Sequence, residues 1–288
     1  YIGGNFKYVG PYTGSGAPVN ATTGELEPPF PHFDGIIYAV CPDMTGGWFV
    51  GGSFTHADKT SISGLAHINA DGTLDTTWRA DTSGTVYALK LYGTTLYVGG
   101  EFTTIGGVAR NRIAAVDATT GSVLAWNPDA SHTVRDLWVT NSTVYAAGEF
   151  TSIGGSTHSR IAAIDRTTGL AAAWDPAANN TVTSIFLSGE VLYAGGYFTL
   201  IGGENRNYLA AFDVTSGTLT GWAPSADQPV EDLCVVGTEV YLGGAFTFVG
   251  GMAREHLAVV DAATGSVVAK IFDANDKVMT LLPVGSVL

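Results

Sequence analysis

A short glycine-containing segment recurs along the whole chain at a spacing of 48 residues. Its six copies read YIGGNF, FVGGSF, YVGGEF, YAAGEF, YAGGYF and YLGGAF, and they begin at Tyr1, Phe49, Tyr97, Tyr145, Tyr193 and Tyr241. Six such periods account for all 288 residues. A fixed period of this length is typical of solenoids and propellers, in which each repeat buries its apolar faces against its neighbours. The spacing therefore restricts the chain to a repeat architecture.

Each period contains four short apolar segments separated by turn residues. In the third repeat they span residues 85–93, 95–102, 112–118 and 122–128, and Val, Ile, Leu, Tyr and Ala fill most of their positions. This composition and the Gly, Asn and Pro residues between the segments are typical of strands, and no stretch has the 3.6-residue periodicity of a helix. A lone four-stranded sheet cannot bury both faces. We therefore predict an all-β fold, a six-bladed β-propeller of 48-residue, four-stranded blades that forms one domain over residues 1–288.

Glycine pairs and tryptophans recur at fixed places in the repeat. The second segment carries pairs such as Gly99-Gly100 and Gly195-Gly196, and the fourth carries Trp78, Trp126, Trp174 and Trp222. A glycine pair weakens a strand, so it indicates close approach of another backbone. We expect the glycines near the propeller axis, where blades converge, and the tryptophans at the wide outer rim.

The two ends of the chain are complementary. The C-terminus reads KVMTLLPVGSVL, which matches a first strand and the opening of a second, and Tyr1 continues it. We predict that residues 277–284 pair with the strand that starts at Tyr1 and close the ring. Without this latch one blade would expose an unpaired edge.

Charge and cysteine content exclude several classes of function. The chain has 13 Lys and Arg against 26 Asp and Glu, a formal net charge of −13, and its basic residues do not cluster. Binding to nucleic acid or to anionic membrane surfaces is therefore disfavoured. No apolar run has the length of a membrane-spanning helix, so we expect no membrane insertion. Cys41 and Cys234 have neither disulfide-framework nor zinc-site spacing, and we expect both to be buried apolar residues.

Several segments resemble a known family. IYAV, FVGGSF, INADGTLDTTW and TVYALKLYGTTLYVGGEF are similar to bacterial delta-60 repeat propellers, most closely over residues 65–104, and the GG-then-Trp pattern is kelch-like. The resemblance implies a module of a larger secreted or cell-surface protein, used for interaction or structure. It implies no particular activity, because propellers host many functions.

The opening of the first strand departs from the repeat in two places. Arg135 and Asp136 stand in one repeat and Glu231 and Asp232 two repeats further on. The aligned positions elsewhere hold the smaller residues Ala39, Ala88, Ser184 and Thr280. We predict that these charged residues line the mouth of the axial channel and form a ligand site. We expect no cofactor; if Asp136, Glu231 and Asp232 converge, the one ion that suits their oxygens is Ca²⁺. The alternative is an ion pair or a solvated channel lining.

Repeats one and two depart from the pattern in their loops. Tyr8, Tyr12, Phe30, His32 and Phe33 occur where other repeats have the GGxxR loop and the Trp segment. Exposed aromatic side chains suit sugar rings or a partner protein. The alternative is that they pack against a neighbouring domain of a longer chain.

Two other polar series follow the repeat and favour structural roles. Each Asp of the D-x-x-[TS]-G turns can bond its own backbone: Asp117, Asp165, Asp213 and Asp261. Arg110, His158, Arg206 and Arg254 recur after the second glycine pair, and we expect them to tie neighbouring blades through a carbonyl or an Asp.

The leading hypothesis is a non-catalytic extracellular or cell-surface propeller, a structural, adhesion or recognition module with a protein or carbohydrate partner. One alternative is a carbohydrate-active hydrolase or lyase with paired carboxylates at the channel mouth. The other is a lectin-like sugar binder that uses the aromatic loops.

Overall fold

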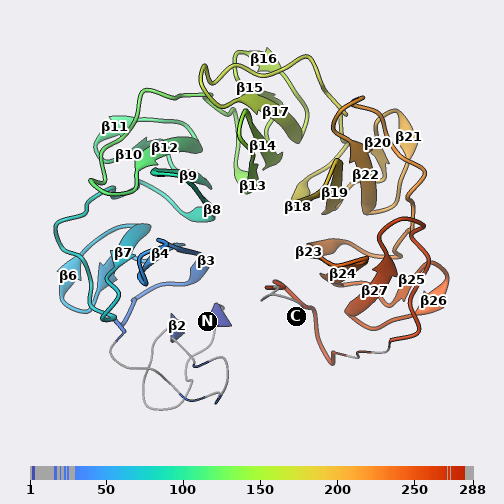
Figure 1. Ribbon diagram of the computed structural model, residues 1–288, viewed down its shortest axis with the longest axis horizontal. Coiled ribbons are helices and arrows are strands. Elements are labelled where there is room, and N and C mark those ends of the chain that lie inside the picture. The colour runs from blue at the N-terminus through green and yellow to red at the C-terminus, as the bar shows by residue number, and fades with distance from the viewer. Residues whose placement is uncertain are drawn as a thin grey trace. The chain divides into compact units, whose positions relative to one another are not determined.

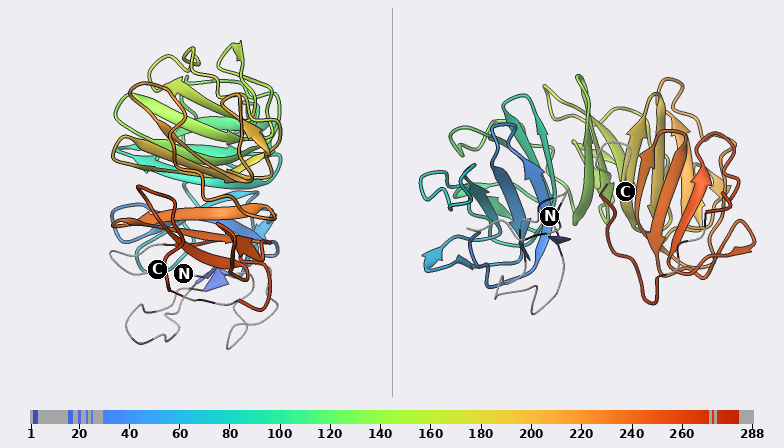
Figure 2. Two further views of the ribbon diagram at one scale, coloured as in Figure 1. Left: turned by 90° about the vertical axis from the view of Figure 1, so that its right-hand side faces the viewer. Right: turned by 60° about the horizontal axis from the view of Figure 1, so that its bottom comes forward.

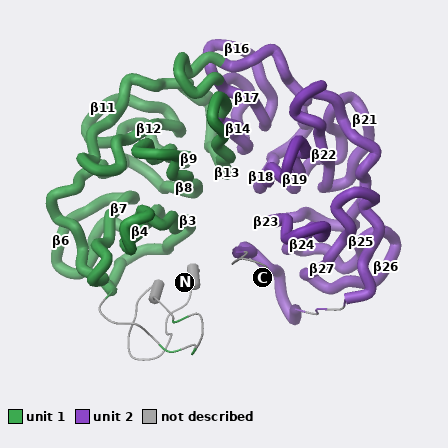
Figure 3. The backbone as a smooth tube through the Cα atoms, in the orientation of Figure 1, with its two compact units in different colours: residues 1–143, 165–170 green, residues 144–164, 171–288 purple. Residues whose placement is uncertain are grey.

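The computed structural model describes residues 2–3, 16–17, 20, 23, 25, 30–270, 272 and 274–282. Every regular element within these residues is a β-strand (Figure 1). A helix that could cross a membrane is absent from the described part of the chain. The chain divides into two compact units (Figure 3): unit 1 comprises residues 1–143 and 165–170, and unit 2 comprises residues 144–164 and 171–288.

Small antiparallel sheets make up both units. In unit 1 they have the orders β3-β4-β7 and β12-β9-β8, and in unit 2 β18-β19-β22 and β23-β24-β27. The strands of unit 1 are β3 (Ile37–Pro42), β4 (Trp48–Gly52), β7 (Leu65–Ile68), β8 (Val86–Tyr92), β9 (Thr95–Gly100), β12 (Ile113–Asp117) and β13 (Val134–Val139). Those of unit 2 are β18 (Val182–Ser188), β19 (Val191–Gly196), β22 (Leu209–Asp213), β23 (Val230–Val236), β24 (Glu239–Gly244) and β27 (Leu257–Asp261). The sheet of residues 230–261, in orange and red, can be followed in both views of Figure 2.

Two further pairs of strands lie near the N-terminus and at the boundary between the units. Near the N-terminus, β1 (Ile2–Gly3) pairs with β2 (Gly16–Ala17). The unit boundary passes through β14 (Thr143–Gly148) and β17 (Ile161–Asp165), most of whose residues belong to unit 2. In each sheet the second strand of the repeat is the central one, and it is buried along most of its length. This burial explains its run of apolar and glycine residues.

Hairpins of two-residue strands follow the second strand in the five described three-stranded sheets. The pairs are β5 (His56–Ala57) with β6 (Thr60–Ser61), β10 (Thr104–Ile105) with β11 (Val108–Ala109), β15 (Ser152–Ile153) with β16 (Ser156–Thr157), β20 (Leu200–Ile201) with β21 (Glu204–Asn205), and β25 (Phe248–Val249) with β26 (Met252–Ala253). Gly106 and Gly107 both have positive φ, at 53° and 75°. A turn with two such residues matches the twist of a tight hairpin and requires glycine there.

The predicted fourth strand is reduced to single bridges. Val116 pairs with Val123, Phe212 with Leu219 and Val260 with Val267, and no longer strand follows within the described residues. Proline lies close behind, at Pro128 and Pro224, and its missing N–H cannot continue a ladder. The prediction of four full strands per repeat was therefore wrong in this detail.

The first glycine of each pair packs against the next repeat. A Cβ at Gly51 would lie 2.6 Å from Val86 Cγ1, and a Cβ at Gly195 would lie 2.8 Å from Val230 Cγ1. Gly99 faces Val134 and Leu137 in the same way. The prediction that another repeat approaches these glycines holds for the first member of the pair. It was wrong for the second, because a Cβ at Gly196 would meet the Thr181 carbonyl oxygen at the start of its own sheet.

The tryptophans join consecutive repeats through their indole N–H. Trp78 Nε1 donates to Ala118 O at 3.0 Å and Trp222 Nε1 donates to Asp261 O at 3.0 Å. Trp126 and Trp174 make the corresponding bonds to Asp165 O and Gly217 O. Trp78 and Trp222 are buried, and the Trp222 ring packs edge-on against Tyr193 with centroids 5.0 Å apart. The bulky residue expected between repeats is therefore also a hydrogen-bond donor.

The recurrent Arg and His side chains act within their own repeat. Arg110 Nη2 donates to Leu124 O at 2.8 Å, and Arg254 Nη2 donates to Val268 O at 3.1 Å. His158 Nε2 contacts Ala172 O at 2.8 Å, and Arg206 Nη2 contacts Thr220 O at 3.4 Å. A carbonyl partner was expected, but its assignment to a neighbouring blade was wrong. The side chain instead holds the segment after the third strand onto its own sheet.

The C-terminal segment occupies the place of a first strand. A Cβ at Gly243 would lie 2.7 Å from Val278 Cγ1 and 3.4 Å from Leu281 Cγ, as Gly51 faces Val86 and Leu89. Residues 283, 284 and Tyr1 lie outside the described residues. Six blades, ring closure and a single domain over residues 1–288 stay predictions.

Candidate functional site

The first strands share an irregularity that directs one side chain out of each ladder. The register with the second strand shifts between Ile37 and Ala39, Val86 and Ala88, Val182 and Ser184, and Val230 and Asp232. The extra residues are Tyr38, Tyr87, Thr183 and Glu231, and Arg135 stands one repeat after Tyr87. Bulges of this kind re-aim side chains and are common beside functional sites. The predicted Arg135 and Glu231 thus belong to one structural series.

Asp232 links three successive repeats in unit 2. Its carboxylate accepts hydrogen bonds from Ser184 Oγ at 2.7 Å, Leu281 N at 2.7 Å and Thr280 Oγ1 at 3.1 Å. Leu233 N donates a further bond at 2.8 Å. Ser184 and Thr280 hold the aligned positions one repeat before and one repeat after Asp232. The three polar residues therefore form one chain of contacts along consecutive first strands.

Asp232 is half-buried. Burial raises the pKa of its carboxyl, and the hydrogen bonds from Ser184, Leu281 and Thr280 lower it only in part. The neighbouring Cys234 is buried and free, and burial raises the pKa of its thiol to about 12. Cys41 is buried and free as well, so the prediction that both cysteines are buried apolar residues is confirmed.

Glu231 has two partners in the same unit. Its Oε1 accepts hydrogen bonds from Tyr197 Oη at 2.5 Å and from Lys277 Nζ at 3.0 Å. The Glu231 side chain is 9% exposed, whereas that of Lys277 is 38% exposed. The pair therefore fastens the C-terminal segment to β23 at a second point beside Asp232.

Arg135 lies on an aromatic series in unit 1. Its guanidinium carbon is 4.4 Å from the ring centroid of Tyr87, whose ring is 5.0 Å from that of Tyr38 at an interplanar angle of 59°. Tyr87 Oη donates a hydrogen bond of 3.0 Å to Glu101 Oε2. Tyr38 is 47% exposed. Two rings, a cation and a carboxylate thus lie together. Tyr38 and Tyr87 stand in the bulges of β3 and β8, and Glu101 directly follows β9.

The four predicted charged residues fall into two groups. Arg135 and Asp136 belong to unit 1, where Asp136 Oδ1 accepts a bond from Leu137 N at 2.7 Å, and Glu231 and Asp232 belong to unit 2. Convergence of the three carboxylates therefore stays a prediction. Across the residues that the structure describes, no group of three or more His, Cys, Asp or Glu side chains is placed to hold a metal ion.

The predicted aromatic shelf is only partly described. Tyr8 and Tyr12 lie outside the described residues. Phe33 is buried, with its ring centroid 4.5 Å from that of Phe54 and 5.9 Å from that of Phe30. Its expected exposure was wrong, because its ring completes the apolar core of the first described sheet. Phe30 and His32 are half-buried, and His32 N donates to Asp58 Oδ1 at 2.9 Å.

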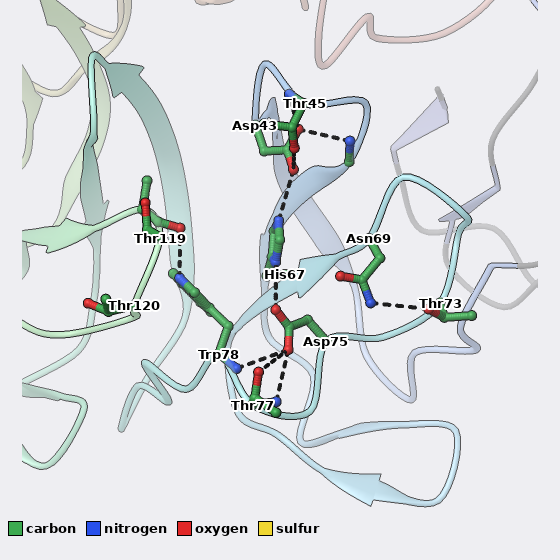
Figure 4. A network of polar contacts seen from close by, with 12 residues as sticks. Asp43, Thr45, His67, Asn69, Thr73, Asp75, Thr77, Trp78, Thr119 and Thr120 are labelled. Carbon is green, nitrogen blue, oxygen red and sulfur yellow. Dashed lines mark hydrogen bonds and ion pairs between the residues drawn. The ribbon is translucent and has the colours of Figure 1, made fainter.

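A polar network that was not expected surrounds His67 (Figure 4). Its Nε2 lies 3.0 Å from Asp43 Oδ2 and its Nδ1 lies 3.1 Å from Asp75 Oδ2. The ring stacks on Phe49 at 4.8 Å, and the aligned residues of later repeats are Ala or Val. A Ser-His-Asp mechanism needs one imidazole nitrogen on a nucleophile. Both nitrogens contact carboxylates, so this network joins two turns of the sheet and holds no catalytic triad.

Sequence reasoning missed the partners of the predicted residues. Tyr87 and Tyr38 were passed over although they stand at the aligned positions before Arg135, and Lys277 was assigned only to the latch. Tyr87 could have been found from the sequence, because it precedes Arg135 by one 48-residue repeat. The role of Asp43 and Asp75 had no such signal, because they lie in turns on either side of His67.

The comparisons with known proteins agree with this architecture. A family model described as outer membrane protein assembly factor BamB (PQQ_2) matches residues 65–271, more than half of the chain. The chain belongs to this family. A second model, a β-propeller domain of unknown function (DUF5122), matches residues 46–77. The BamB-like chain is thus a β-propeller repeat protein, and such propellers commonly serve as protein-interaction modules. A search of curated proteins gives no match.

Solved structures share the fold of this BamB-like chain at low identity. The computationally designed Ika8 protein is 13% identical with a TM-score of 0.57, and the match covers 90% of this chain and 81% of that one. The extracellular domain of a protein described as a one-component system of B. thetaiotaomicron is 13% identical with a TM-score of 0.53. That match covers 84% of this chain and 29% of the other. These likenesses concern the fold alone.

Proposed function

We propose that the chain is a non-catalytic recognition module of delta-60 type, at the cell surface or outside the cell, that binds a partner through its first-strand bulges. The observation that carries the proposal is the exposed Tyr38 ring beside Tyr87 and Arg135. Tyrosine and arginine are enriched at the energetic centres of protein interfaces. The bulges described in four first strands supply a rigid base for such side chains.

The carboxylates of unit 2 support a binding role over a catalytic one. Asp232 accepts four hydrogen bonds and Glu231 accepts two, all from groups of the chain itself. A glycosidase needs one carboxyl group to donate a proton and another to act on water or the sugar. Carboxylates that already hold strands together are poorly placed for that exchange.

The proposal includes a closed ring of six blades. The packing of Val278 and Leu281 on Gly243 supports it, because these residues take the place of a first strand. Removal of residues 277–288 is expected to lower the melting temperature and promote aggregation, since it uncovers Gly243 and the Asp232 carboxylate. Replacement of Lys277 alone is the milder control. A truncated protein with unchanged melting and solubility would contradict closure.

Binding is tested with the full chain against a displayed peptide library and an oligosaccharide panel, each screened in parallel with Tyr38→Ala/Tyr87→Ala. We expect ligands that bind the wild type and are lost on the double variant, with no change in the ligand itself. Binding that is indifferent to both tyrosines would refute the proposed surface. Cleavage of an oligosaccharide would favour the enzyme alternative.

A further inference from the structure

We infer that the exposed ring of Tyr38 is the binding site for an arginine side chain of a partner protein. The inference rests on the proposed recognition function and names the chemistry of the partner. It concerns unit 1 alone, where Tyr38, Tyr87, Arg135 and Glu101 all lie.

The ring of Tyr38 is held in place and open to solvent. Tyr38 is the extra residue of the bulge in β3, and its ring packs at 59° against Tyr87. With 47% of its surface exposed, Tyr38 is among the most exposed large aromatic residues described. Such a ring, supported on one side and free on another, loses little side-chain freedom when a partner covers it.

The contact between Arg135 and Tyr87 shows that a ring of this series binds a guanidinium group. The guanidinium of Arg135 lies 4.4 Å from the centre of the Tyr87 ring, and Arg135 follows Tyr87 by one repeat. A cation within about 6 Å of a ring centroid is attracted by the negative face of the π-system. Tyr87 covers one part of the Tyr38 ring, and a partner's guanidinium on the exposed remainder would make the same kind of cation–π contact that Arg135 makes with Tyr87.

Charge favours a cation over other ligands. The net charge of −13 steers basic partners toward the molecule. The Glu101 carboxylate, which accepts the Tyr87 hydroxyl, stands in the same group and offers a further acceptor oxygen. Hydrogen bonds from His56 and Thr55 outweigh burial and hold the pKa of Asp34, near the start of β3, well below its usual range. Arginine fits better than lysine because its planar guanidinium both stacks on a ring and bonds a carboxylate in fork geometry.

The experiment compares an arginine-containing peptide with the same peptide carrying citrulline, which keeps the shape and removes the charge. Binding to the full chain is followed by the resonances of ¹³C-labelled tyrosine rings. We expect the arginine peptide to shift the Tyr38 resonance and to bind more tightly than the citrulline peptide. Tyr38→Ala should weaken binding about two- to fivefold, the range for an exposed cation–π contact, and Tyr38→Phe should keep it.

Phe248→Ala is the matched control, because Phe248 is 49% exposed and lies in unit 2. It should leave binding of the arginine peptide unchanged. Equal binding of the two peptides, or equal losses in Tyr38→Ala and Phe248→Ala, would overturn the inference. Tyr38-dependent ligands without a basic residue would overturn this inference and leave the recognition function standing. A complete lack of Tyr38-dependent ligands would remove the recognition function itself.

Discussion

Ser184 and Asp232 stand 48 residues apart in the sequence, and the Ser184 hydroxyl donates a hydrogen bond of 2.7 Å to the Asp232 carboxylate. The same carboxylate accepts the backbone N–H of Leu281, which lies one repeat further on. A half-buried acid thus stands at the position that Ala39 and Ala88 hold in two repeats of unit 1. At this position a hydrogen bond between first strands takes the place of an apolar contact.

Replacement of Asp232 by Ala should destabilise the protein by about 1–3 kcal/mol, because buried donors lose their acceptor. Asp232→Asn should lie between the two, since its amide oxygen still accepts from the donors on one side while its NH₂ group faces the donors on the other. Urea denaturation with fixed m-values measures both, and Ser184→Ala controls for the loss of one partner. An Asp232→Ala protein as stable as the wild type would show that these bonds contribute nothing.

The two members of a glycine pair should respond differently to the same substitution. Gly195→Val should cost about 1–3 kcal/mol through overpacking against Val230, and Val230→Ala should recover part of that loss. Gly196→Val meets the Thr181 carbonyl oxygen, which no side-chain truncation can move, so Val230→Ala should not rescue it. A double-mutant cycle gives the two coupling energies. Equal coupling at both positions would refute the assignment of their neighbours.

Acid should loosen the sheet of β3, β4 and β7. Burial tends to raise the pKa values of Asp43 and Asp75, but hydrogen bonds from Thr45, Thr77 and His67 lower both to about 2. Because these values lie below the ordinary 3.8, the carboxylates stabilise the fold above about pH 4, and that contribution is lost as the pH falls toward 2. Wild-type stability should fall over this range. The double variant Asp43→Asn/Asp75→Asn should be less stable than the wild type at pH 7, and its free energy of unfolding should fall less between pH 4 and pH 2. Equal falls in the two proteins would show that these carboxylates do not cause the pH dependence.

Calcium should leave the melting temperature unchanged. Both oxygens of Asp232 accept hydrogen bonds from the chain, and Glu231 accepts from Lys277 and Tyr197. Binding an ion there would first require these donors to leave. Differential scanning fluorimetry with millimolar calcium, with magnesium as control, checks the expectation. A calcium-specific rise that disappears in Asp232→Asn would show that the acids converge on the ion after all.

The sequence predicted the repeat architecture because its signals are local and repeated. Glycine pairs, turn prolines and tryptophans recur at one spacing. The glycines mark close packing, the prolines mark the end of strand pairing, and the tryptophans mark the contact between consecutive repeats. The site was less predictable. The bulge that turns Tyr38 outward is a property of strand register, and nothing in the residues around it distinguishes it from the buried Leu89 or Val50.

Residues that depart from the repeat were easy to find in the sequence, but their contacts and their burial were not. Asp232 and Glu231 were singled out because they depart from the repeat, and their partners come from segments whose approach depends on the folded chain. Phe33 shows the opposite error, since an aromatic residue in an irregular loop was expected at the surface and completes a core. Burial of such a residue depends on tertiary packing, for which the sequence around it carries no periodic signal.

The contact between Gly51 and Val86 recurs as Gly99 with Val134, Gly195 with Val230 and Gly243 with Val278, always 35 positions along the chain. In these four described repeats a glycine thus leaves space for a valine of the next repeat. Duplication or loss of a whole 48-residue gene segment leaves each remaining junction correctly matched. A shift of any other length breaks a junction, so this lineage can change its blade number most readily in whole repeats.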